Sequence, residues 1–79
     1  MGNIFLVIEM RLRIRDLRED RDLTQGDIAK YLNCDQSGYS KYEREERPIP
    51  VALLVRLAEY YNTSVDYLLG LTDNPKPYK

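Results

Sequence analysis

Apolar residues recur at steps of three and four along most of the chain, and this spacing predicts helices. The first helix is expected at about residues 11–21, where Ile14, Leu17 and the following Leu23 face inward between charged neighbours. No sustained alternation of the kind that predicts a strand follows Met10. The body of the chain is therefore predicted to be all-α.

Two short helices separated by a three-residue turn are predicted next. Thr24 can cap the first of them, with Asp27 completing a capping box, and this helix runs to Leu32. Asp35 is a suitable cap for the second helix, which continues to about residue 43 or 44. Asn33 suits the turn because asparagine accepts the left-handed backbone conformation at low cost.

Small and apolar residues surround the predicted joint between these two helices. Ala29 fits the close approach of two helix backbones. Cys34 is the single cysteine and is interpreted as a small core residue, not as a reactive thiol. The arrangement is typical of a helix-turn-helix and suggests DNA binding. The residues expected to face inward are Ile28, Leu32, Cys34, Tyr39 and Tyr42.

Two more helices are predicted beyond Pro48. Pro50 suits the first position of the fourth helix. Thr63 or Ser64 can cap the fifth, and Gly70 ends it. The apolar stripe of the fourth helix is Leu53, Leu54, Leu57, Ala58 and Tyr61, and that of the fifth is Val65, Leu68 and Leu69.

The first nine residues differ from the helical body, since the apolar run Ile4–Ile8 favours a strand. One interpretation is an accessory segment that packs on the core or lacks order. The other is a strand that pairs with its counterpart in a second subunit. The chain is accordingly divided into an extension (1–9), a helix-turn-helix domain (10–72) and a C-terminal tail (73–79).

Composition excludes several functional classes. The 79 residues support one domain, and 43% hydrophobic with 32% charged residues is ordinary for a globular fold. The chain has no histidine, one cysteine and no glycine-rich phosphate loop, so we expect no enzymatic activity, metal site, cofactor or small-molecule ligand. No secretory signal or membrane-length apolar run occurs, so we expect a cytoplasmic protein with no membrane contact.

The charge balance is a point against nucleic-acid binding. The net charge is −1, and residues 11–47 contain nine basic and nine acidic side chains. Nucleic-acid binders usually carry a basic excess that releases counterions from phosphate. Any positive surface must therefore come from the arrangement of charges on one face.

Five ordered blocks carry a family resemblance between about Arg13 and Gly70. They are Ile14, Leu17 and Arg18; Leu23-Thr24-Gln25; Ser40-Lys41-Tyr42-Glu43-Arg44; Leu57-Ala58; and Ser64-Val65-Asp66-Tyr67-Leu68-Leu69-Gly70. In these blocks the chain resembles the Cro/cI-type helix-turn-helix family, also called the XRE family. The resemblance implies a compact five-helix bundle, similar to the DNA-binding domain of phage repressors.

The resemblance also implies that the helix at residues 35–44 enters the major groove of DNA. Gln36, Ser37 and Lys41 would face base edges, with Ser40 nearby. Their chemistry agrees, because glutamine can bond adenine, serine donates or accepts, and lysine reaches guanine acceptors. The alternative for each is a solvated helix face. Phosphate contacts are implied for Thr24, Gln25, Arg44 and Arg47.

Arg18 and Glu43 resemble a family pair that ties the first helix to the third. The chain departs from the family pattern at two positions. Gly38 lies inside the predicted reading helix, and Glu45 stands where the family usually has a helix-ending glycine. A left-handed backbone at Glu45 would be strained by about 1 kcal/mol, and Glu46 adds a second negative charge near the expected DNA backbone.

For function we favour a homodimeric, sequence-specific repressor that binds a double-stranded operator, since no activation surface is visible. A single reading helix with a near-neutral surface offers few contacts, which is why a dimer is expected. Its candidate interface is Tyr60, Leu71 and Tyr78, assisted by Ile4–Ile8. The alternative is a protein-interaction module, such as an antitoxin or an assembly partner. Salt-dependent binding of duplex DNA distinguishes the two.

Overall fold

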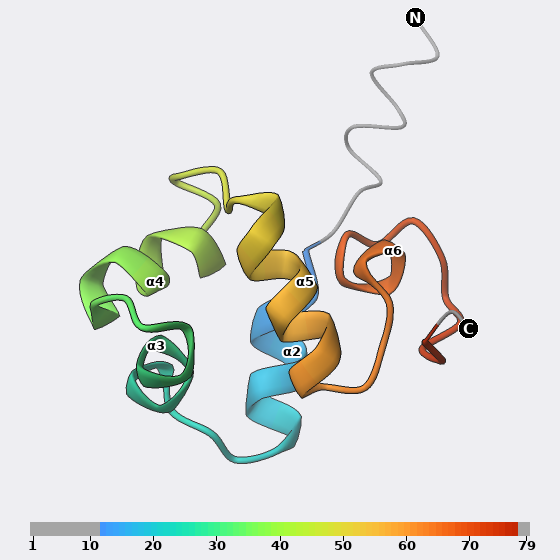
Figure 1. The fold of residues 1–79 in the computed structure, drawn as a ribbon, viewed down its shortest axis with the longest axis horizontal. Helices are drawn as coiled ribbons and strands as arrows, with labels where there is room; N and C mark the ends of the chain where they lie inside the picture. The colour runs from blue at the N-terminus through green and yellow to red at the C-terminus, as the bar shows by residue number, and fades with distance from the viewer. Residues whose placement is uncertain (1–11, 78–79) are drawn as a thin grey trace, which may run out of the picture.

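The computed structural model describes residues 12–77 of the chain, and every regular element in that range is a helix (Figure 1). The all-α prediction, with five helices in the domain, is confirmed for these residues. The predicted strand at Ile4–Ile8 lies outside them. The helices are α2 (Ile14–Asp20), α3 (Gln25–Leu32), α4 (Gln36–Glu43), α5 (Val51–Tyr60) and α6 (Val65–Leu68).

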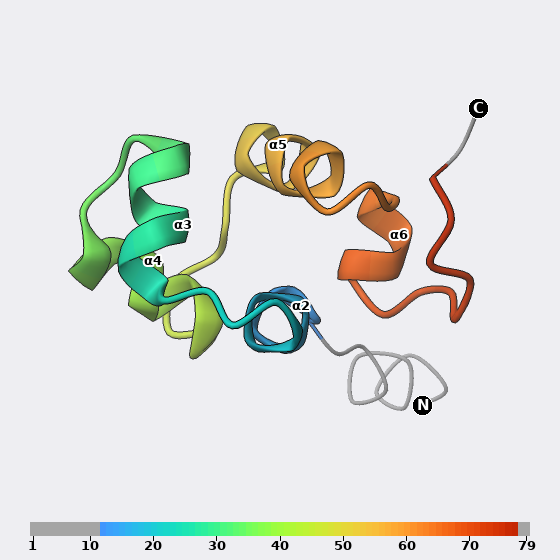
Figure 2. The same ribbon diagram turned by 90° about the horizontal axis from the view of Figure 1, so that it is seen from below.

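The helices are arranged around a core to which each of them contributes. Helices α3 and α4 lie together at one end, α2 and α5 occupy the middle, and α6 lies at the other end beside the C-terminal tail (Figures 1 and 2). Burial of each large apolar side chain stabilises the fold by about 1.5–3 kcal/mol. One fully buried large side chain comes from each helix, namely Ile14, Ile28, Tyr39, Leu57 and Leu68.

Polar side chains begin three of the helices as predicted. The Thr24 hydroxyl accepts from the Asp27 N–H at 3.0 Å, and the Asp27 carboxylate accepts from the Thr24 N–H at 2.9 Å, which confirms the capping box. Asp35 caps α4. Ser64, and not Thr63, caps α6, because Thr63 is buried and its hydroxyl donates to the Pro75 carbonyl.

Two predicted helix starts are wrong. Helix α2 begins at Ile14 and not at about residue 11, because the backbone N–H of Arg13 donates to the Leu68 carbonyl at 2.8 Å and residues 12 and 13 are not helical. Pro50 precedes α5 instead of occupying its first position, since its ψ of 145° is extended. Proline restricts φ but leaves ψ open, so the residue type alone does not separate these two positions.

The five helices of residues 12–77 all end in the same backbone turn. In α3, for example, the N–H of Asn33 donates to the Lys30 carbonyl and the N–H of Cys34 donates to the Ala29 carbonyl, which is a Schellman arrangement. The predictions for Asn33 and Gly70 are therefore confirmed. The residues with positive φ at the five ends are Asp22, Asn33, Glu45, Asn62 and Gly70.

Glu45 is the least suitable of these residues for a left-handed backbone, and its φ is 59°. Replacing Glu45 by Gly is therefore expected to raise the melting temperature or leave it unchanged. The free energy of unfolding should increase by at most about 1 kcal/mol. Thermal unfolding followed by circular dichroism measures this. The matched control is Asn33→Gly, which should gain less because asparagine tolerates positive φ. A clear drop for Glu45→Gly would contradict the strain.

Candidate nucleic-acid interface

Helix α4 has one buried side and one exposed side. Tyr39 and Glu43 are buried against the rest of the domain, whereas Gln36, Ser37 and Lys41 are exposed. Ser37 and Lys41 lie one helical turn apart and share one exposed side of α4, whereas Gln36 is exposed at the first position of the helix, seven residues before Glu43. Three of the four side chains predicted to read bases are therefore exposed.

The side chain of Gln36 extends toward the first turn of α3. A Cβ added at Gly26 would lie 3.3 Å from the Gln36 Oε1 atom and 3.6 Å from the Thr24 hydroxyl oxygen. Gly26 thus leaves room for Gln36 beside the start of α3. Sequence reasoning did not single out Gly26, although a glycine in the first turn of a helix is a signal for close approach.

Arg18 and Glu43 form a two-point ion pair between α2 and α4. The Arg18 Nε atom donates to Glu43 Oε2 at 2.7 Å, and Nη2 donates to Oε1 at 3.0 Å. The side chains are only 11% and 1% exposed, respectively. Arg18 also donates from Nη1 to the Leu23 carbonyl at 2.8 Å. The pair therefore fixes α4 both to α2 and to the segment that precedes α3.

Gln25 joins this cluster, a contact that sequence reasoning missed. Its Nε2 atom donates to Glu43 Oε1 at 3.0 Å. A carboxamide nitrogen carries two N–H groups, so one remains for a phosphate. The phosphate role implied for Gln25 is therefore compatible with its position, and its side chain is held in place by a buried carboxylate.

The charges in this cluster are fixed by their neighbours. Burial would raise the pKa of Glu43, but the hydrogen bonds from Arg18 and Gln25, together with the nearby Tyr39 hydroxyl, outweigh burial and lower the pKa below its ordinary value. Burial, together with the nearby Glu43 carboxylate, raises the pKa of Tyr39 far above the usual range. Burial also raises the pKa of Tyr61 to about 12. At neutral pH Glu43 is charged and both tyrosines are neutral.

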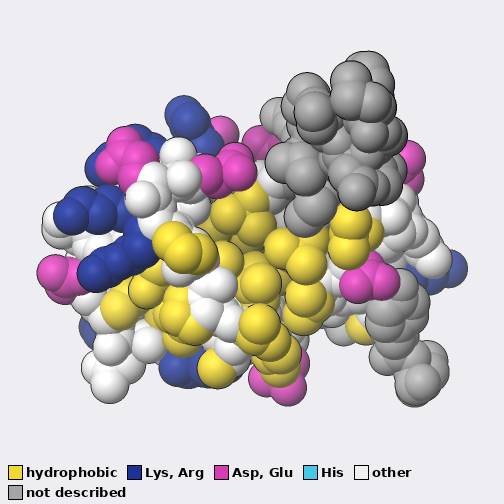
Figure 3. Space-filling view, turned by 90° about the horizontal axis from the view of Figure 1, so that it is seen from above, with side chains coloured by type: hydrophobic (Ala, Val, Ile, Leu, Met, Phe, Trp, Pro, Cys, Tyr) yellow, Lys and Arg dark blue, Asp and Glu magenta, His cyan; other side chains and the backbone are white. Residues whose placement is uncertain are grey.

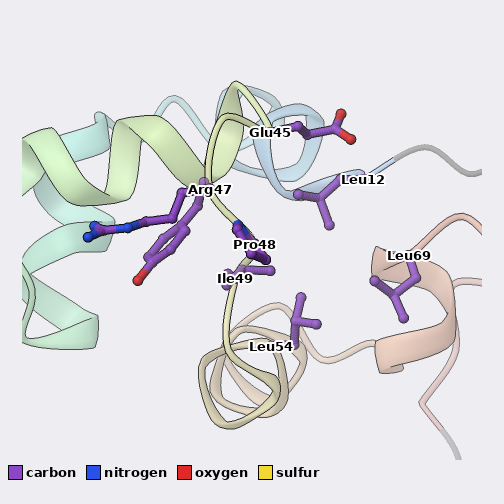
Figure 4. Close-up of a pocket in the computed structure, with 8 residues that line it drawn as sticks. Leu12, Glu45, Arg47, Pro48, Ile49, Leu54 and Leu69 are labelled. Carbon is purple, nitrogen blue, oxygen red and sulfur yellow. The ribbon is translucent and has the colours of Figure 1, made fainter.

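Arg44 and Arg47, predicted to contact phosphate, point in different directions. Arg44 pairs with Glu46 and also donates to the Ser40 hydroxyl, so Ser40 is half-buried beneath an arginine and not simply exposed. Arg47 points away from the neighbouring loop residues (Figure 4). Its Nη1 atom would lie 3.6 Å from a Cβ added at Gly38.

Gly38 is explained by the cap of its own helix. The N–H of Gly38 donates to the Asp35 carboxylate at 3.0 Å. A Cβ added at Gly38 would lie 2.6 Å from that same carboxylate oxygen, so a larger residue must displace the cap. This departure from the family pattern therefore has a local structural reason.

A polar hollow of about 300 Å³ lies where α2, α3 and α4 meet. It brings together Gln25 and Arg44, two of the residues predicted to contact phosphate. It also contains Arg15, which sequence reasoning did not select. The lining side chains are Arg15, Arg18, Gln25, Ser40, Glu43 and Arg44.

Apolar side chains gather on another face of the molecule (Figure 3). An apolar hollow of about 390 Å³ opens beside the α4–α5 connection, and Leu12, Ile49, Leu54 and Leu69 converge on it (Figure 4). The remaining residues that line this hollow are Tyr42, Glu45, Arg47 and Pro48.

Of the predicted dimer residues, Tyr60 is 41% and Leu71 is 57% exposed, and Tyr78 lies outside the described residues.

Comparison with known families agrees with this geometry. The profile of the helix-turn-helix family matches residues 14–68, which is the range from α2 to α6. The chain therefore belongs to the Cro/cI-type, or XRE, helix-turn-helix family. Among residues 12–77, no helix is long and apolar enough to span a membrane, and no three potential metal ligands of the His, Cys, Asp and Glu types form a metal-binding group.

Several bacterial proteins are similar to the chain. It is 45% identical over 65 residues to the uncharacterized HTH-type transcriptional regulator YobD of Bacillus subtilis (strain 168), covering 82% of this chain and 58% of that protein. It is 38% identical over 58 residues to the HTH-type transcriptional regulator ImmR of the same strain, covering 73% and 46%. It is 29% identical over 58 residues to the cryptic phage CTXphi transcriptional repressor RstR of Vibrio cholerae, covering 73% and 52%. The chain spans about half the length of these relatives. No solved structure matches it.

Proposed function

We propose that this chain binds double-stranded DNA in a sequence-specific manner and acts as a small transcriptional repressor without enzymatic activity. The observation that carries the proposal is the two-sided character of α4. Ser37 and Lys41 are exposed on one side and Gln36 is exposed at the first turn, while the Arg18–Glu43 pair fixes the other side of the helix to α2. A reading helix needs such a rigid support for its base-contacting side chains. The relatives named as regulators and as a repressor support the same function.

In this proposal α4 lies in the major groove and the surrounding residues hold the DNA backbone. The exposed side chains of α4 contact base edges. Thr24 and Gln25 at the start of α3 face a phosphate, because the N–H groups at a helix start attract an anion. Arg44 and Arg47 lie toward further phosphates, and such contacts carry no sequence preference.

Selection of bound duplexes from a random pool tests the proposal. We expect a defined motif to be enriched, and its affinity to fall with salt by about 0.9 log units per log unit for each neutralised phosphate. The chain should also dissociate faster from a scrambled duplex of the same length than from the selected duplex. Absence of enrichment together with absence of salt-dependent binding would contradict DNA recognition and favour a protein-interaction module.

We further propose a homodimer that reads two half-sites about 34 Å apart across a two-fold axis. A near-neutral monomer has few phosphate contacts, and exposed Tyr60 and Leu71 supply apolar contact area. Sedimentation at micromolar concentration should give a dimer, and the enriched motif should be palindromic. A monomer at all concentrations would contradict a preformed dimer.

Because its named relatives are bacterial regulators, we propose that the chain acts in the cytoplasm.

The same measurement on a chain that lacks residues 1–9 tests the role of the N-terminal segment. If Ile4–Ile8 pairs with its counterpart in the second subunit, the truncated chain should dissociate at a higher concentration. An unchanged dimer after truncation would remove this segment from the interface and leave Tyr60 and Leu71 as its apolar part.

A further inference from the structure

The guanidinium of Arg44 is already engaged by a carboxylate of its own chain. The Nε atom donates to Glu46 Oε2 at 2.8 Å, and the Nη2 atom donates to Glu46 Oε1 at 3.1 Å. A third donor, Nη1, contacts the Ser40 hydroxyl. Glu46 occupies one of the two guanidinium edges through which arginine makes two-point contacts to phosphate, and Nη2 belongs to both edges.

The backbone turn at the end of α4 sets this pairing. The N–H of Glu46 donates to the Lys41 carbonyl at 3.0 Å, and φ at Glu45 is 59°, so the chain reverses and Glu46 lies beside Arg44. A side chain at this point of a Schellman turn commonly makes an apolar contact with its own helix. At the other four helix ends the equivalent residue is uncharged, namely Leu23, Cys34, Thr63 and Leu71.

The position of Arg44 brings it close to the proposed phosphate contact. Arg44 and Gln25 line the same polar hollow between α2, α3 and α4. A phosphate that accepts from Gln25 at the start of α3 therefore enters the space that Arg44 borders. The Glu46 carboxylate offers the same negative charge and the same pair of oxygen acceptors as that phosphate.

We propose that Glu46 competes with a DNA phosphate for the guanidinium of Arg44 and so lowers the affinity of the chain for DNA of every sequence. This inference rests on the proposed DNA binding. In the parent protein, a contact between Arg44 and phosphate replaces one ion pair with another, and little affinity is gained. Phosphate contacts carry no sequence information, so Glu46 sets the strength of binding and leaves base preference unchanged.

Removing the Glu46 carboxylate should leave the fold intact. The side chains of Arg44 and Glu46 are 50% and 55% exposed, and ion pairs with this exposure contribute little to stability. The control substitution is Glu45→Gln, which removes an equal charge one residue away. The Glu45 carboxylate makes no ion pair or side-chain hydrogen bond with the described residues. The pair of variants therefore separates the contact with Arg44 from the general effect of net charge.

The experiment compares the parent, Glu46→Gln and Glu45→Gln proteins on the selected operator and on a random duplex between 50 and 200 mM salt. Glu46→Gln should bind both duplexes more tightly by the same factor. Its plot of log affinity against log salt should be steeper by about 0.9, because one more phosphate is neutralised. Between 50 and 200 mM salt, the affinity of this variant should therefore fall by a factor about 3.5-fold larger than that of the parent. Glu45→Gln should keep the slope of the parent.

A substitution at Arg44 completes the test. Arg44→Gln alone should change the affinity of the parent little. The double variant with Arg44→Gln and Glu46→Gln should lack the gain in affinity of Glu46→Gln, because that gain requires a released guanidinium. If the parent binds DNA and Glu46→Gln behaves like the parent, or like Glu45→Gln, the competition is overturned while DNA binding stands. If none of the proteins binds duplex DNA, the proposed function itself is wrong and the inference falls with it.

Discussion

Replacing Glu43 by Ala is expected to lower the free energy of unfolding by about 3–5 kcal/mol, because the largely buried Arg18 loses its two-point carboxylate partner and keeps only Glu19, 3.8 Å away. Urea unfolding measures the change. The control is Glu46→Ala, which removes an exposed carboxylate paired with Arg44 at the surface. That change should cost at most about 1 kcal/mol, since both side chains of the pair are at least half exposed. Equal losses for the two variants would contradict a structural role for the buried pair.

The same pair predicts a dependence of stability on pH. The pKa of Glu43 is lowered in the folded state from its ordinary value of 4.5. Its stabilising contribution is therefore complete above about pH 4.5 and is lost as the pH falls through the lower, folded-state pKa. The difference in unfolding free energy between the parent and Glu43→Gln should shrink on acidification in that window. A difference that stays constant down to pH 2 would mean that Glu43 is not held as an anion.

Alanine at Gln36 or Lys41 is expected to reduce discrimination between the operator and single-base variants by about 1–3 kcal/mol each. Both side chains are exposed on α4, whereas Gln25 lies at the start of α3. Alanine at Gln25 should instead weaken binding to all duplexes by the same factor. Binding titrations of each variant against a panel of operators measure the difference. Equal losses across the panel for all three variants would contradict the assignment of base-reading residues.

One contact affects how the Gln25 variant is interpreted. Gln25 donates to buried Glu43, so its removal also takes away a hydrogen bond to a charged group, worth about 1.5–3 kcal/mol. Unfolding of Gln25→Ala must be measured beside its binding, and the affinity must be compared at temperatures where the variant is folded. A loss of affinity that persists in the fully folded protein then reports on phosphate.

The sequence by itself determined the helices and their ends to within a few residues. The capping box of Thr24 and Asp27, the cap at Asp35 and the turn at Asn33 are all formed as predicted. These features depend on contacts between residues at most five positions apart, so the local sequence contains all the information they require. Proline is compatible both with the first position of a helix and with the position before it, and at Pro50 the sequence prediction chose the wrong one.

Family resemblance supplied what periodicity could not, because Arg18 and Glu43 lie 25 residues apart and nothing local links them. The resemblance identified the pair but gave no indication of its third member, Gln25. It also selected Arg44 as a phosphate contact without indicating that its guanidinium is paired with Glu46.

Only the tertiary structure decided which side chains meet between helices. The contact of Gln25 with Glu43, the position of Gln36 beside Gly26 and the hollow that Arg44 lines all depend on the angle at which α3 and α4 cross and on their docking against α2. A helix repeat fixes which face of each helix is apolar, but it leaves the rotation and separation of two packed helices to the fit of their side chains. The elements of the proposed site were therefore legible in the sequence, and their mutual arrangement was set by packing.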